Sequence, residues 1–180
     1  MLSIQNSSSY QDEDLPNINL INKYIQGALD TPNGPYFDAK SHLLNKHNNT
    51  QDKIIINKNT YPLLNISYVT NQEMQQINAK FRDKNKPTNI LSFPAQAPTG
   101  MIFENHLGDL ILAPEVISQE AKDLNQDLNL YYAHIFIHGV LHLKGYDHIT
   151  DEDAEVMEKL EAKLILSLKL FSDFSDHGSQ

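Results

Sequence analysis

Three histidines close together constrain this chain more than any other feature of its sequence. His138 and His142 are four residues apart, His148 follows six residues later, and Gly145 lies between the second and third histidines. On a helix, residues four apart lie on the same face, so two imidazoles can point at one centre. A glycine readily adopts the left-handed conformation that ends a helix and turns the chain back. The spacing therefore predicts a metal site with three imidazole ligands, His138, His142 and His148.

The type of metal site follows from the number of ligands. Three imidazoles with one open position are typical of catalytic zinc, because structural zinc sites usually fill all four positions with protein side chains. The chain has no cysteine, which excludes thiolate ligands. We therefore expect one Zn²⁺ ion, although three imidazoles also accept nickel or copper.

The spacing is also that of the extended zinc-protease motif H-E-x-x-H-x-x-G-x-x-H, in which the glutamate is the general base. This chain has Gly139 in place of that glutamate. A zinc peptidase is therefore the weaker alternative. A hydrolase built this way must activate its water through the metal, another side chain or the substrate.

Residues 133–148 closely resemble the signature of the YbeY family. Two further stretches, FRDKNKPTNILSFP at 81–94 and LGDLIL at 107–112, match the family in the same order, and the resemblance covers residues 61–172. It implies a single-strand-specific, zinc-dependent endoribonuclease that acts in ribosomal RNA maturation, at the 3′ end of the small-subunit rRNA, and in ribosome quality control. The implied partners are ribosomal RNA and the small ribosomal subunit or its associated proteins. A non-enzymatic ribosome assembly factor with a structural metal is an alternative.

Arg82 lies in the second matching stretch, where the family's arginine is linked to activity. A guanidinium binds phosphate through a fork of donors and stays charged at any working pH. We predict that Arg82 is catalytic and stabilises charge on the phosphate, whereas the residues alone favour a surface arginine at a helix end. The neighbouring lysines are predicted to bind RNA phosphates, with a solvated turn as the alternative: Lys80, Lys84 and Lys86.

Two further residues beside the histidines receive weaker assignments. His134 shares a helix face with His138 but lies about 12 Å from His142 along the axis, too far for one ion to bind both easily. We predict that His134 contacts a ligand or the substrate, or is a core histidine. Asp147 either steadies a metal ligand through a hydrogen bond or caps the turn.

The net charge of −9 opposes RNA binding through long-range repulsion. Basic residues nevertheless concentrate at 80–86, while much of the acid lies at 12–14 and 151–161. We therefore expect weak, salt-sensitive binding to free RNA, helped by a partner, and no DNA binding. No stretch has the apolar length of a membrane span, and no secretory signal opens the chain, so a cytoplasmic location without membrane contact is expected.

The pattern of apolar residues predicts an α/β (α+β) fold in one domain, 1–180: a small mixed β-sheet packed by helices, with a central metal-bearing helix. Strands are expected at 3–6, 63–70, 89–93 and 107–112. Helices are expected at 15–29, 72–82, 114–124, from 127 or 129 through the histidines, and at 151–171, with a tail from 174. Residues 30–59 read as a loop or insertion.

Overall fold

The computed structural model describes residues 2–6, 10, 15–16, 18–35, 63–95 and 106–175. The predicted insertion at 30–59 falls largely outside these residues. The described strands are β1 (Leu2–Asn6), β2 (Leu63–Tyr68), β3 (Ile90–Pro94) and β4 (His106–Leu112). The described helices are α1 (Ile18–Asp30), α3 (Asn71–Arg82), α4 (Pro114–Asp123), α5 (Leu128–Leu143) and α6 (Asp151–Ser175).

The strands form one mixed sheet in the order β1-β2-β4-β3. Strands β1, β2 and β4 run parallel, and β3 pairs antiparallel with β4 along an edge. Pro94, expected to stop β3, is instead its last residue and lies opposite Gly108. Proline is tolerated there because the outer side of an edge strand needs no hydrogen-bond donor. The predicted mixed sheet is thus confirmed.

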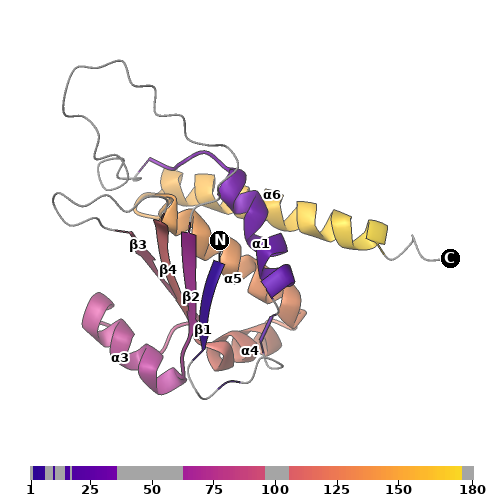
Figure 1. Ribbon diagram of the computed structural model, residues 1–180. Coiled ribbons are helices and arrows are strands. Elements are labelled where there is room, and N and C mark those ends of the chain that lie inside the picture. The colour runs from indigo at the N-terminus through magenta and orange to yellow at the C-terminus, as the bar shows by residue number, and fades with distance from the viewer. Residues whose placement is uncertain are drawn as a thin grey trace, which may run out of the picture.

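Helices cover the two faces of the sheet unequally (Figure 1). The main core joins α1, α5 and one sheet face, and includes Ile25, Phe136 and Ile66. A smaller cluster joins α3 to the other face, where Met74 meets Leu91. Successive residues of a strand point to opposite faces, so the same strands supply both clusters. Helix α3 lies toward the β3 edge, away from β1 (Figure 1).

Helix α5 occupies the centre of the molecule, as its apolar composition predicts. Phe136, Ile137, Val140 and Leu141 are fully buried along it. At Gly139 the helix approaches the sheet so closely that an added Cβ would lie 2.6 Å from Ile90 Cδ1 and 2.9 Å from Leu110 Cδ2. The side chain that a protease carries at this position therefore has no room between α5 and the sheet.

Local signals at the helix starts behave as expected. Asp127, one of two predicted starts for α5, accepts a hydrogen bond from the Leu130 backbone N–H at 3.0 Å. Thr70 and Glu73 form a reciprocal capping box at the start of α3. Such caps satisfy N–H groups that the first turn leaves without partners.

The ends of helices differ more from the prediction. Helix α6 continues to Ser175, beyond the expected end at residue 171, so residues 174 and 175 are helical where a tail was expected. The rest of the expected tail, residues 176–180, lies outside the described residues. Helix α1 begins at Ile18 rather than near residue 15. The apolar stripe that guided the prediction reports which residues are buried, whereas a helix can continue past its last packed residue.

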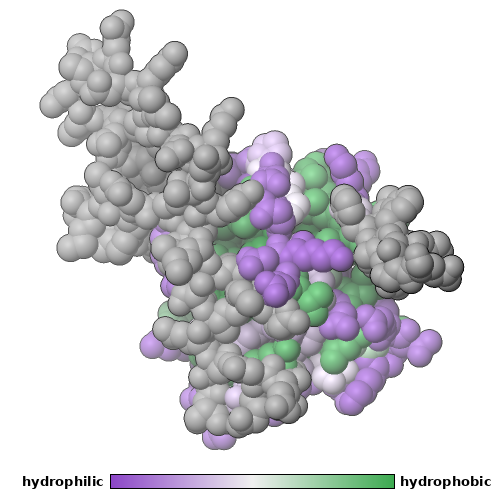
Figure 2. Space-filling model, turned by 45° about the vertical axis from the view of Figure 1, so that its right-hand side comes forward, coloured by the Kyte–Doolittle hydropathy of each residue, from purple (hydrophilic) through white to green (hydrophobic). Residues whose placement is uncertain are grey.

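The described part of the chain contains no helix that is both long and apolar enough to cross a membrane. In the face shown in Figure 2, hydrophilic residues surround several separate hydrophobic patches.

Candidate metal centre

The end of α5 and the turn after it bring the three predicted histidines together. His138 and His142 lie one helical turn apart, and their ring centroids are 4.5 Å apart. The His148 ring lies 4.7 Å from His142 and 5.3 Å from His138. Each imidazole offers one nitrogen, and the three nitrogens lie within 4.8 Å of one another.

A glycine turn places His148, as predicted. Gly145 has a φ of 81°, in the left-handed region. The Gly145 N–H donates to the His142 carbonyl at 2.9 Å, and the Tyr146 N–H donates to the Leu141 carbonyl at 3.0 Å. These two bonds form a Schellman motif, which reverses the chain and brings the following residues back over the helix end.

The turn is also tied to the distant N-terminal helix. Lys144 is buried, and its ammonium group donates to the backbone carbonyls of Leu29, at 2.6 Å, and of Thr31. The Tyr146 hydroxyl donates to the Pro32 carbonyl at 3.0 Å. The end of α1 and the residues just after it therefore hold the turn in place.

Hydrogen bonds fix the orientation of two of the imidazoles. His138 Nδ1 lies 2.7 Å from Glu161 Oε1, and His142 Nδ1 lies 3.0 Å from the Tyr146 carbonyl oxygen. Both partners are acceptors, so each Nδ1 carries the proton and each Nε2 keeps its lone pair. The two Nε2 atoms are 3.1 Å apart. With neither of them protonated this is no hydrogen bond, and the two lone pairs face one centre.

This geometry fits a metal ion. Bonds of about 2.0–2.1 Å at tetrahedral angles place two ligand nitrogens roughly 3.3 Å apart. A cation between the lone pairs removes their repulsion. His138, His142 and His148 are therefore a suitable set of ligands, with an open position for water or substrate.

The protonation of His142 suits this role. Burial, together with the neighbouring imidazoles of His138 and His148, lowers the pKa of His142 to about 4. The ring is thus neutral at neutral pH, and neutral imidazole is the form that binds metals.

Glu161 on α6 is a member of the site that the sequence did not identify. Its carboxylate is buried and contacts His138 at 2.7 Å and His134 Nε2 at 3.5 Å. Burial opposes ionisation, but the hydrogen bonds from His134 and His138 outweigh it and lower the pKa of Glu161 to about 2. An ionised carboxylate on Nδ1 orients a ligand imidazole and makes it more basic.

A signal for Glu161 was present in the sequence. It lies four residues after Met157 and three before Leu164, on the stripe of α6 that faces the core. A carboxylate on an apolar stripe needs a buried partner. The many acidic residues between 151 and 161 conceal this exception.

The structure shows what His134 and Asp147, the two residues with weaker assignments, contact. His134 lies outside the three-histidine cluster, and its side chain is 40% exposed, so the interpretation as a core histidine is wrong. Its contact is Glu161, through which it reaches His138. Asp147 Oδ1 accepts a hydrogen bond from the His148 backbone N–H at 2.9 Å, which caps the turn. The same oxygen lies 3.8 Å from His142 Nδ1 and 3.6 Å from His148 Nδ1.

Arg82 lies at the end of α3 beside edge strand β3. Its Nη2 donates to the Ser92 carbonyl at 3.2 Å, and its guanidinium lies 5.5 Å from the centre of the Phe93 ring. The Ser92 hydroxyl in turn donates to the Gly139 carbonyl at 3.2 Å, next to His138. Arg82 and Gly139, the neighbour of His138, thus both contact Ser92 of β3. The basic residues around Arg82 are exposed: Lys80, Lys84 and Lys86.

Fold and site together define a small α+β protein whose central helix carries a three-histidine centre able to hold a metal ion. A family model described as Endoribonuclease YbeY matches residues 36–169. This chain therefore belongs to that family, as its three motifs predict.

Individual relatives agree with this assignment. Endoribonuclease YbeY of Francisella tularensis subsp. tularensis is 44% identical over 133 residues, which cover 71% of this chain and 79% of that protein. Endoribonuclease YbeY of Francisella philomiragia is 47% identical over 132 residues, covering 72% and 77%. A solution structure from Thermotoga maritima shares the fold at 20% identity, with a TM-score of 0.54 over 99% of this chain and 97% of that one.

Proposed function

We propose that this protein is a zinc-dependent, single-strand-specific endoribonuclease of the cytoplasm. Its proposed substrate is ribosomal RNA, at the 3′ end of the small-subunit rRNA, with a role in ribosome quality control. The observation that carries the proposal is the position of the Nε2 atoms of His138 and His142. They lie 3.1 Å apart, and each ring is oriented by a hydrogen-bond acceptor on its Nδ1. The family membership supports RNA as the substrate.

Each residue of the site has a defined part in this proposal. His138, His142 and His148 hold the ion, and Glu161 keeps His138 in its binding orientation. A bound Zn²⁺ supplies a Lewis acid for phosphate oxygens and acidifies water toward a pKa of about 7. Arg82 binds the phosphate whose charge increases during cleavage, an electrostatic role.

Peptide hydrolysis is disfavoured by packing as well as by sequence. Gly139 occupies the position of the protease base and is pressed against Ile90 and Leu110. A glutamate there would point into the core rather than toward the metal.

The test is cleavage of a single-stranded rRNA fragment by wild type, His138→Ala and Arg82→Ala, purified identically. Arg82 is the single arginine of the chain, so the matched control is Lys122→Ala, an exposed cation on α4. We expect activity in wild type and Lys122→Ala, and its loss in the other two. Equal activity in all four would mean a contaminating ribonuclease and would refute the proposal.

Ribosome association requires a separate measurement. Co-sedimentation of the full chain with small ribosomal subunits, at low and high salt, tests for the partner. Normal binding by His138→Ala and Arg82→Ala, combined with no RNA cleavage by any preparation, would favour the assembly-factor alternative.

A further inference from the structure

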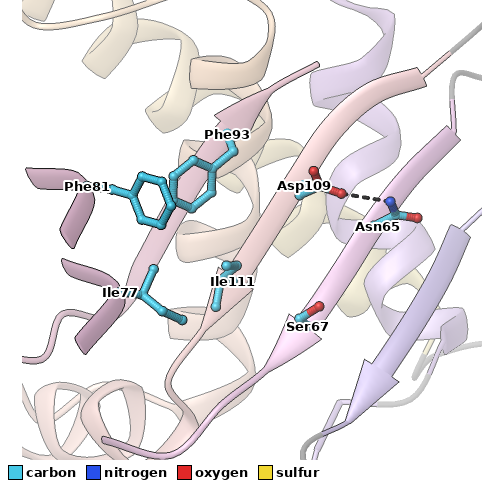
Figure 3. A pocket seen from close by; sticks show the side chains of 7 residues that line it. All are labelled: Asn65, Ser67, Ile77, Phe81, Phe93, Asp109 and Ile111. Carbon is cyan, nitrogen blue, oxygen red and sulfur yellow. Dashed lines mark hydrogen bonds between the residues drawn. The ribbon is translucent and has the colours of Figure 1, made fainter. Parts of the chain in front are cut away.

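A pocket of about 300 Å³ lies on the face of the sheet opposite α5, between α3 and strands β2 and β4. Figure 3 shows Phe81 and Phe93 side by side at one end of it, and Asp109 joined to Asn65 at the other. One end is therefore apolar and aromatic, and the other is polar. Small-ligand pockets combine apolar walls with a few placed polar groups in the same way.

The aromatic end offers a surface for stacking. The Phe81 and Phe93 rings meet edge to face, with centroids 5.2 Å apart. Phe81 is 51% exposed although it is a large apolar side chain, so part of its ring is open to a ligand. Bases of single-stranded RNA stack on such rings irrespective of their sequence.

Cations lie directly beside this end of the pocket. Lys80 Nζ lies 5.1 Å from the centre of the Phe81 ring, and the Arg82 guanidinium lies 5.5 Å from that of Phe93. Two cations around a partly exposed aromatic pair are complementary to a ligand with planar rings and phosphates. In a chain of net charge −9, this concentration of positive charge favours a nucleic acid over an apolar peptide segment.

The polar end offers a carboxylate in a fixed position. Asn65 Nδ2 donates to Asp109 Oδ1 at 2.7 Å, and His106 Nε2 lies 3.6 Å from the same oxygen. Within the described part of the chain no residue donates a hydrogen bond to Oδ2, so that oxygen can accept from a ligand. Among RNA bases, guanine alone presents two adjacent N–H donors on its Watson–Crick edge. Oδ2 can accept one of them, and Oδ1, which has a second lone pair beside the one that Asn65 uses, can accept the other.

Edge strand β3 connects the pocket to α5, the helix that carries His138 and His142. Ser92 and Phe93 are neighbours and point to opposite faces: the Ser92 hydroxyl contacts Gly139 of α5, whereas Phe93 lines the pocket. Arg82 lies at this edge and contacts both residues. An RNA strand that crosses the edge can thus place a phosphate at Arg82 and a nearby base in the pocket.

We propose that this pocket binds one unpaired base of the RNA, preferentially guanine, close to the cleaved bond. The base stacks on Phe81, and its donor edge faces Asp109. The choice of RNA as the ligand and the position beside the cleaved bond both rest on the proposed function.

The test is fluorescence anisotropy of the full-length protein with short labelled RNAs that differ only in a central base, G, A, C or U, in a uridine background. EDTA prevents cleavage during the measurement. We expect the guanine strand to bind roughly tenfold more tightly than the others. Asp109→Asn should remove this preference, whereas Asp123→Asn, an exposed aspartate on α4, should keep it.

A second pair of variants tests the stacking. Phe81→Leu should weaken binding of all four strands by roughly fivefold or more, and Phe81→Tyr, which keeps the ring, should not. Thermal denaturation checks that both variants fold, as expected for a half-exposed side chain. Equal affinity for the four bases, or unchanged affinity in Phe81→Leu, would overturn the proposal and leave the pocket to a protein partner.

The two proposals fail separately. If the protein binds the guanine strand through Asp109 but cleaves no RNA, the base pocket stands and the endoribonuclease does not. If it cleaves RNA with no base preference near the cut, and the anisotropy agrees, the endoribonuclease stands and the base pocket does not.

Discussion

Replacing Glu161 by glutamine tests whether its charge supports metal binding. The glutamine keeps the size of the side chain and can present an oxygen to His138 Nδ1, now 2.7 Å from Glu161 Oε1, but it carries no charge. The wild-type carboxylate is ionised, because its pKa is lowered to about 2 by hydrogen bonds that outweigh its burial. Loss of such a partner typically reduces metal affinity by about 10- to 100-fold, or roughly 1.4–2.7 kcal/mol.

The assay is competition for zinc with a chelator of known affinity at neutral pH. Glu158→Gln is the matched control, because Glu158 is an exposed glutamate on the same helix. We expect weaker zinc binding in Glu161→Gln and unchanged binding in Glu158→Gln. Equal affinity in both variants and wild type would show that the charge of Glu161 does not strengthen zinc binding, and the role given to that charge would be wrong.

Two further predictions concern stability. Gly139→Ala should lower the free energy of unfolding by about 1–3 kcal/mol, since its Cβ would lie 2.6 Å from Ile90 Cδ1. An unchanged midpoint of urea denaturation would contradict this, because it would mean that α5 and the sheet move apart at no cost to make room for the methyl group. The metal-free protein should lose stability as pH falls from 6.5 to about 4, because the unfolded chain protonates His142 in that range while the folded chain does not. This pKa difference corresponds to a loss of at most about 3 kcal/mol in the free energy of unfolding, and the full stability is present above the unfolded pKa. A flatter dependence of stability on pH in His142→Gln would support the prediction, and an unchanged dependence would contradict it.

The elements of the fold could be predicted largely from local sequence. Each described strand and helix was expected, because periodicity, caps and proline positions act within a few residues of one another. Helix ends were less accurate, as α6 shows. The order of the strands and the side on which α3 packs depend on contacts between distant segments, which periodicity does not report.

The site divides in the same way. His138, His142 and His148 could be grouped from spacing alone, because one helix and one turn connect them. Glu161 could not, because it reaches His138 from another helix, 23 residues further along the chain. The pocket beside Phe81 also escaped prediction, because its polar end comes from strands whose pairing was unknown.

The attachment of Lys144 and Tyr146 to the end of α1 has a consequence for the order of folding. These hydrogen bonds join residues 113–115 positions apart, and Glu161 lies later still in the chain. Contacts so distant in sequence form late, because closing a long loop costs entropy before any contact repays it. Because the chain is made from its N-terminus, the three histidines precede Glu161, and His138 acquires its carboxylate partner only once α6 packs on α5. The contact that orients this ligand is therefore among the last parts of the fold to form.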